Sequence, residues 1–85
     1  MSTFDGAVIK EQGVTFGVVV ARHGSSSADR TQLMAAASQL FGGIPVVAME
    51  QDSRGVPTYF GRRDLVGFLA SVPIEAIPWK RYTAR

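Results

Sequence analysis

The run from Val14 to Arg22, Val-Thr-Phe-Gly-Val-Val-Val-Ala-Arg, constrains the fold of this chain more than any other stretch. Its residues favour β structure, and apolar side chains occupy both alternating sets of positions along it. A strand with one face in water would instead alternate apolar and polar residues. The run therefore predicts a central strand that is covered on at least one face and partly on the other.

The flanking sequence predicts further elements in a regular order. Turn residues, caps and hydrophobic periodicity indicate strands over 7–12, 14–22, 44–51, 57–60 and 74–77, and helices over 28–41 and 63–71. The strand–helix–strand spacing across 14–51 is that of a crossover connection, so the second and third strands should run parallel. Gly67 lies inside the second helix, where glycine costs about 1 kcal/mol relative to alanine, and it indicates close packing.

This order predicts an α+β fold. Residues 1–78 should form a single two-layer domain, ββαββαβ, with a mixed four- to five-stranded sheet and two helices on one face. Residues 79–85 are expected to form a basic aromatic C-terminal tail. The strand over 74–77 should be an edge strand, because Pro78 has no N–H to donate to a neighbour.

Several classes of site are excluded by residue counts. The chain has no cysteine, which removes disulfides and thiolate metal sites, and its single histidine, His23, cannot build a multi-histidine metal centre. No metal and no cofactor are expected. The uncharged stretch 31–49 contains polar residues, a glycine pair and Pro45, so no membrane span is expected. The amino terminus lacks the segments of a signal peptide, which favours a cytoplasmic protein of bacterial type.

A parallel second and third strand would bring a serine-rich loop and a turn to one end of the sheet. A Gly/Ser loop before a helix presents backbone N–H groups that bind phosphate or carboxylate. The alternative is that the serines only cap and link the helix. The residues of this candidate anion or small-molecule site are His23, Gly24, Ser25, Ser26, Ser27 and Arg54.

The same end also carries the residue types of a hydrolase. His23 would act as base, one of Ser25, Ser26, Ser27 or Ser53 as nucleophile, and Asp52 would orient the histidine. No Gly-x-Ser-x-Gly motif supports this arrangement. Whether the chain is an enzyme therefore stays open, and the sequence favours the answer that it is not.

The opposite end is expected to be basic and aromatic, because the fourth and last strands should both run toward it. Cations interleaved with aromatic rings suit single-stranded nucleic acid or RNA, in which phosphates take the cations and bases stack on rings. The residues of this candidate nucleic-acid site are Arg62, Arg63, Trp79, Lys80, Arg81, Tyr82 and Arg85.

Association with a second copy is the function that the composition favours. Hydrophobic residues make up 46% of the chain and charged residues 19%, against about 25% charged in average domains. A core this small leaves apolar area on the surface, which is typical of interfaces. We therefore expect a small non-enzymatic interaction module that self-associates, as a homodimer or another homo-oligomer, or that binds another protein. Tyr59 and Trp79 are the candidate interface residues, and nucleic-acid binding and anion binding are the alternatives.

Overall fold

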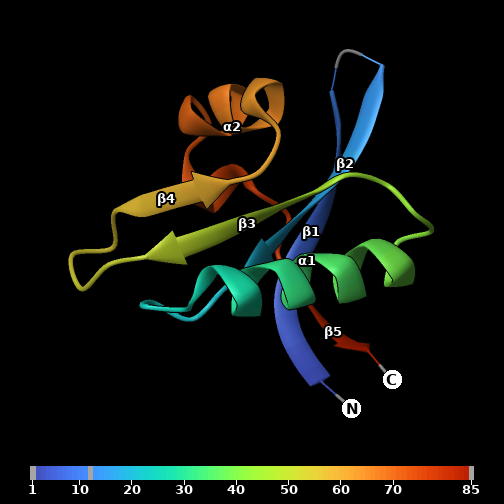
Figure 1. Ribbon diagram of the computed structural model, residues 1–85. Helices are drawn as coiled ribbons and strands as arrows, with labels where there is room; N and C mark the ends of the chain where they lie inside the picture. Colours follow the sequence, from blue (N-terminus) through green and yellow to red (C-terminus); the bar gives the residue numbers. More distant parts are fainter. Residues whose placement is uncertain (1, 12, 85) are drawn as a thin grey trace.

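The structure is a computed structural model, and it describes residues 2–11 and 13–84 of the 85-residue chain. Its elements follow the predicted order, ββαββαβ, with one short 3₁₀ helix added before the last strand (Figure 1). They are β1 (Ser2–Glu11), β2 (Val14–Val20), α1 (Ser27–Leu40), β3 (Val46–Gln51), β4 (Pro57–Phe60), α2 (Arg63–Ala70), η1 (Ile74–Ala76) and β5 (Lys80–Ala84). The predicted α+β fold is confirmed at this level.

The five strands form one mixed sheet in the order β4-β3-β2-β1-β5. β2 lies in the middle and runs parallel to β3, with Val18 beside Val47, and the other neighbours are antiparallel. The central strand and the parallel crossover are therefore confirmed. Because β1 pairs with β5 from its first residues, the two described ends of the chain lie side by side, with Ser2 opposite Ala84.

One face of the sheet, which we call the Phe16 face, carries large apolar side chains. Phe16 and Val18 of β2 and Val47 and Met49 of β3 are buried there, beneath Leu65 and Leu69 of α2. These two leucines lie four residues apart, so they project from the same side of a helix onto the sheet. The remaining buried members of this cluster are Ala7 and Ile77.

The other face, which we call the Val19 face, carries smaller residues and is covered by α1. Val19, Val46 and Ala48 are buried against Ala37, with Phe4 completing the cluster. Phe41 at the end of α1 packs directly on the backbone of β2, since a Cβ built on Gly17 would lie 2.7 Å from its ring. A glycine in the central strand thus permits a close approach that a side chain would block.

The two helices cover opposite faces of the sheet, which corrects the expectation of two helices on one face. Successive residues of a strand point to opposite faces, so Val18 belongs to the cluster under α2 and Val19 to the cluster under α1. The physical reason is visible in β2 and β3, which are apolar at both alternating positions. A single helical layer would leave half of these valines in water, and the second helix removes them from it.

Three further local predictions are wrong. Residues 74–76 form the 3₁₀ helix η1 instead of a strand, and the last strand is β5, inside the segment expected to be a tail. The proline pair Pro73 and Pro78 brackets η1, so the chain resumes extended pairing only after Trp79. Nothing lies within 4 Å of a Cβ built on Gly67, so this glycine does not mark close packing. No helix of the described residues is long and apolar enough to cross a membrane.

Candidate functional site

The direction of each strand decides which candidate residues share an end of the sheet. Because β2 and β3 are parallel, the loop 22–26 after β2 and the turn 52–55 after β3 lie at one end, which we call the serine-loop end. β4 runs away from this end, whereas β5 is antiparallel to β1 and runs toward it. The expectation that the last strand runs in the same direction as β4 is therefore wrong.

An internal carboxylate holds the serine loop. The backbone N–H of Gly24 donates to Oε1 of Glu50 over 2.9 Å, and Nη1 of Arg30 donates to Oε2 over 2.8 Å. The side chains of Arg30 and Glu50 are only 19% and 10% exposed. A loop N–H and a guanidinium are the donors that an anion site would offer to an anionic ligand. Here Glu50 supplies that anion from within the chain.

Arg30, which belongs to α1, also contacts the serine loop and β4. It also donates to the carbonyl of Ser25 over 2.7 Å, and its guanidinium carbon lies 4.0 Å from the centre of the Phe60 ring in β4. α1, the serine loop, β3 and β4 are therefore joined at one point. We call these residues, Gly24, Ser25, Arg30, Glu50 and Phe60, the Glu50 network. Arg30 and Glu50 were not among the residues predicted from the sequence, although a glutamate at the end of an otherwise apolar strand indicates the need for a partner inside the protein.

The other residues of the anion candidate have ordinary structural roles or face solvent. The side chain of Ser26 caps α1 by accepting from the N–H of Asp29 over 3.1 Å, and Ser27 is the first residue of the helix. His23 and Arg54 are exposed. The N–H of Arg54 donates to the carboxylate of Asp52, as does the N–H of Val56, so Asp52 closes its own turn.

The hydrolase arrangement is not assembled in the described residues. No hydrogen bond joins His23 to Asp52 or to Ser53 in this part of the chain, and the carboxylate of Asp52 is occupied by backbone donors. In the same residues no group of three or more His, Asp or Glu side chains lies close enough to hold a metal ion. The geometry therefore offers neither a nucleophile paired with a base nor a metal centre there.

The basic candidate is divided between the two ends. Arg62 and Arg63 follow β4 at the end opposite the serine loop, whereas Lys80, Arg81 and Tyr82 belong to β5. Arg62 forms an exposed two-bond ion pair with Asp64, and this hydrogen-bonded guanidinium lowers the pKa of the Asp64 carboxyl. Arg81 forms a 2.8 Å ion pair with Asp5, and Arg85 lies outside the described residues. The described members of this candidate site do not form one patch.

Trp79, by contrast, borders a hollow on the Phe16 face, which we call the Trp79 groove. The groove measures about 450 Å³, its floor is formed by Val20 and Met49, and Ile74 of η1 forms part of its wall. The indole N–H of Trp79 donates to the carbonyl of Ile74 over 3.1 Å, which fixes the ring at the wall. The polar residues that line it are Asp5, Gln51, Lys80 and Arg81.

Tyr59, the other interface candidate, belongs largely to the core. It is half-buried against the cluster beneath α2, and its hydroxyl has no hydrogen-bond partner among the described residues. Burial raises the pKa of this hydroxyl, because the charged form is poorly solvated there. The ring therefore contributes apolar packing.

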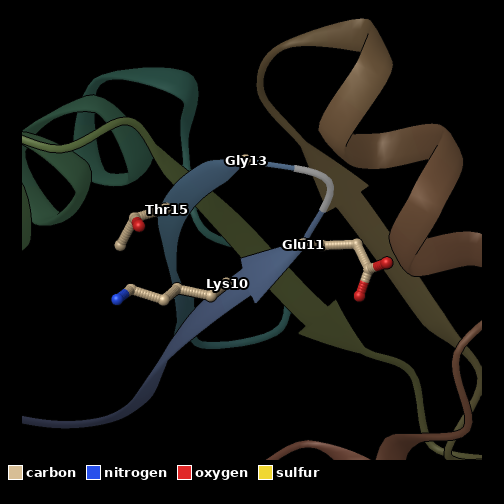
Figure 2. A pocket seen from close by; sticks show the side chains of 4 residues that line it. All are labelled: Lys10, Glu11, Gly13 and Thr15. Carbon is tan, nitrogen blue, oxygen red and sulfur yellow. The ribbon is translucent and has the colours of Figure 1, made fainter.

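A second hollow lies at the tip of the β1–β2 hairpin, between Lys10, Glu11, Gly13 and Thr15. Figure 2 shows that the side chains of Lys10 and Thr15 point to one side of the hairpin and that of Glu11 to the other. This agrees with the register, in which Lys10 is opposite Thr15. Side chains that diverge in this way cannot surround a ligand, so this hollow is no binding site.

The two outer strands of the sheet differ in ways that bear on association. β4 has four residues and begins with Pro57, whereas β5 has five and no proline. At the centre of β5, Tyr82 stacks on Phe4 at 5.8 Å between ring centres and meets Phe41 edge-on at 4.9 Å. β5 therefore offers an open outer edge with an aromatic cluster behind it.

Comparisons of the chain with protein families, with curated proteins and with solved structures found no match.

Proposed function

We propose that this protein is a small non-enzymatic interaction module that pairs with a second copy of itself through the outer edge of β5. The observation that carries the proposal is that β5 ends the sheet with five consecutive residues and no strand beyond them in the described part of the chain. The outward N–H and C=O groups of such an edge are a template for another strand.

The alternative edge is less suited to this role. Pro57 in β4 has no N–H to offer, and a four-residue strand gives few hydrogen bonds. In β5 the charged residues Lys80 and Arg81 occupy one half only, and the carboxylate of Asp5 pairs with Arg81. Like charges therefore do not extend along the whole edge.

The amount of exposed surface also supports association. The chain exposes 5498 Å², whereas a folded monomer of 9.1 kDa exposes about 4,900 Å². The excess of about 600 Å² is close to the roughly 800 Å² that each partner buries in a standard interface. The chain's mean hydropathy of +0.11 points the same way, because a core this small does not bury all of its apolar residues.

A twofold axis at Tyr82 gives the pairing that places these residues best. Antiparallel pairing about this axis sets Arg81 opposite Thr83 of the second copy, and Lys80 opposite its Ala84. The two Tyr82 rings then meet on the Val19 face, where aromatic cross-strand pairs are favourable. Each copy contributes the same surface, as a twofold interface requires.

Charge placed at Thr83 tests both the interface and its register. Thr83→Lys puts a cation directly opposite Arg81 twice per dimer, which should weaken association about tenfold, and Thr83→Glu should strengthen it by a similar factor. Thr58→Lys on β4 is the matched control, because Thr58 is also an exposed threonine on an outer strand. Analytical ultracentrifugation gives the dissociation constants. A strict monomer at every soluble concentration overturns the proposal.

A crosslink provides a second test of the register. The chain has no cysteine, so Tyr82→Cys introduces a single thiol at the twofold axis. Opposite residues of antiparallel strands have Cα atoms about 4.5–5.5 Å apart, within the range that a disulfide spans. Oxidation should give a covalent dimer of Tyr82→Cys and none of Thr58→Cys. The proposal also keeps the cytoplasmic location expected from the sequence, which imaging of a fluorescent fusion in cells tests.

A further inference from the structure

β5 covers only the first half of the outer side of β1. β1 extends from Ser2 to Glu11, but its pairing with β5 ends where Gly6 is opposite Lys80. Residues 74–76, which precede β5, form η1, so no strand of the described residues lies beside 7–11 of β1 on that side. We call residues 7–11 of β1 the edge gap, and we infer that it binds an extended acidic peptide as an added strand. This inference goes beyond the proposed self-association and does not depend on it, because the gap lies in line with β5 and not outside it.

The backbone of the edge gap is held on one side only. β2 pairs with β1 over residues 6–11, with Val8 opposite Gly17. Successive residues of an antiparallel strand direct their N–H and C=O groups alternately to the two sides, so alternate residues of the gap direct these groups outward. No loop or turn of the described residues forms a backbone hydrogen bond with residues 7–11. The gap spans about 17 Å, and its outward groups are a template for an extended peptide.

The side chains beside the gap favour an acidic partner. Val8 and Lys10 lie on the Val19 face, and Lys80 lies on the same face at the Gly6 end of the gap. Val8 is 41% exposed, both lysines are exposed, and the salt bridges of the described residues include neither lysine. The carboxylate of Glu11 points to the other side of the hairpin (Figure 2). A strand with a carboxylate opposite Lys10, an apolar side chain opposite Val8 and a carboxyl end near Lys80 therefore matches this face in charge and polarity.

A second copy of this chain does not supply such a strand. Of its outer strands, β4 carries no charged residue and β5 carries two cations, which would lie beside the lysines of the gap. Lysines on an open edge discourage pairing between copies and leave a partner of opposite charge as the suitable occupant. Divergent side chains, which cannot surround a small molecule at the hairpin tip, suit an added strand, because such a strand presents its own side chains alternately to the two faces.

The pentapeptide acetyl-Thr-Glu-Thr-Val-Thr, with a free C-terminal carboxylate, is the probe. Laid antiparallel to β1, it places its glutamate opposite Lys10, its valine opposite Val8 and its terminal carboxylate near Lys80. Titration should shift the amide resonances of residues 7–11 saturably, and hydrogen exchange of the outward amides should slow, because they gain hydrogen bonds. Acetyl-Thr-Lys-Thr-Val-Thr-amide should bind about fivefold more weakly. Equal affinity for the two peptides, or shifts at 7–11 without slower exchange, would overturn the inference.

Three variants separate the charge of the gap from the charge of the whole chain and from self-association. Lys10→Glu should weaken the acidic peptide about fivefold and bind the lysine peptide better than the parent chain does. Arg54→Glu is the matched control, because it makes the same change in charge at an exposed residue outside the gap, and it should leave both affinities unchanged. Thr83→Lys, which weakens the proposed dimer, should bind the acidic peptide as the parent chain does. Amide chemical shifts outside the gap confirm that each variant is folded. Affinity for the acidic peptide that is unchanged in Lys10→Glu, or reduced equally in Arg54→Glu, would overturn the assignment.

Discussion

On the Phe16 face, α2 lies over large aliphatic and aromatic side chains, whereas on the Val19 face α1 lies over smaller residues, mainly valines, Ala48 and Gly17. α2 has eight residues and buries two leucines, and α1 has fourteen and buries only Ala37 completely. The longer helix therefore contributes fewer fully buried apolar side chains. It is held instead by the close approach of Phe41 to Gly17 and by the Glu50 network.

This difference shows that the two helices are specified in different ways. Apolar burial under α2 depends on the total volume of the side chains and tolerates changes that preserve it. The contacts under α1 depend on a missing side chain at one residue and on a carboxylate at another, and few substitutions satisfy either requirement. The three predictions below test this contrast, in order of decreasing effect.

Removal of the Glu50 carboxylate should affect stability most. Glu50→Ala leaves the partly buried Arg30 without its counterion and the N–H of Gly24 without an acceptor, at a cost of about 3 kcal/mol in the free energy of unfolding. Acetate in the buffer should restore part of this loss by occupying the vacated position. Urea unfolding with and without acetate measures both effects.

The exposed ion pair between Arg62 and Asp64 provides the control for this prediction. Asp64→Ala breaks a pair of the same chemistry, with the same 2.8 Å contact, at a position in solvent. We expect no measurable change in Tm and no response to acetate, because exposed pairs are weak. A Glu50→Ala variant as stable as the parent chain would show that α1 does not depend on the network.

A methyl group at each of two glycines should have opposite effects. Gly17→Ala forces the Phe41 ring away from β2 and should cost about 1–3 kcal/mol, because this ring is packed against Phe4 and Tyr82. Gly67→Ala meets nothing within 4 Å and should add up to about 1 kcal/mol through helix propensity. Thermal unfolding of both variants measures the difference. Equal effects would mean that α1 does not approach the sheet so closely.

The smallest effect concerns the hydroxyl of Tyr59 on the Phe16 face, which has no hydrogen-bond partner within residues 2–11 and 13–84. Burial raises the pKa of Tyr59 above its usual value of 10.0, so the unfolded chain loses this proton at a lower pH than the folded chain. The free energy of unfolding is therefore not reduced by this ionisation below pH 10, and it decreases as the pH rises from there toward the folded-state pKa. Tyr59→Phe should remove this loss and raise stability near neutral pH by about 0.5–1 kcal/mol. Urea unfolding from pH 8 to 11 compares the two chains, and a parallel decline in both would contradict the prediction.

The order of most helices and strands along the chain was predictable because the sequence signals for each element are local. Valines at both alternating positions of 14–22, the serine cap and the glycine pair 42–43 locate the central strand, α1 and the parallel crossover. The same valines also required cover on both faces, and this requirement was not applied to the placement of the second helix. Periodicity locates an element along the chain, but it does not say which face of the sheet that element covers.

The candidate sites were less predictable because they depend on pairs of distant residues. The serine loop was located correctly, but twenty-six residues of sequence separate Gly24 from the carboxylate that it binds. The Trp79 groove required the direction of β5, which follows from its pairing with β1 and not from its own basic sequence. Trp79, Lys80 and Arg81 line one hollow, whereas Arg62 and Arg63, which the sequence grouped with them, lie at the other end of the sheet.

The unequal outer strands have a consequence for how far association can proceed. A sheet with two open edges can add copies indefinitely and form fibres. Here Pro57 begins one outer strand, and the proposed twofold pairing would occupy the outer edge of β5, so neither flank of the ten-stranded sheet that the proposal implies would readily recruit a third chain. Under the proposed pairing, growth would stop at two copies, because a proline at the start of a four-residue strand makes the other outer edge a poor template for polymerisation.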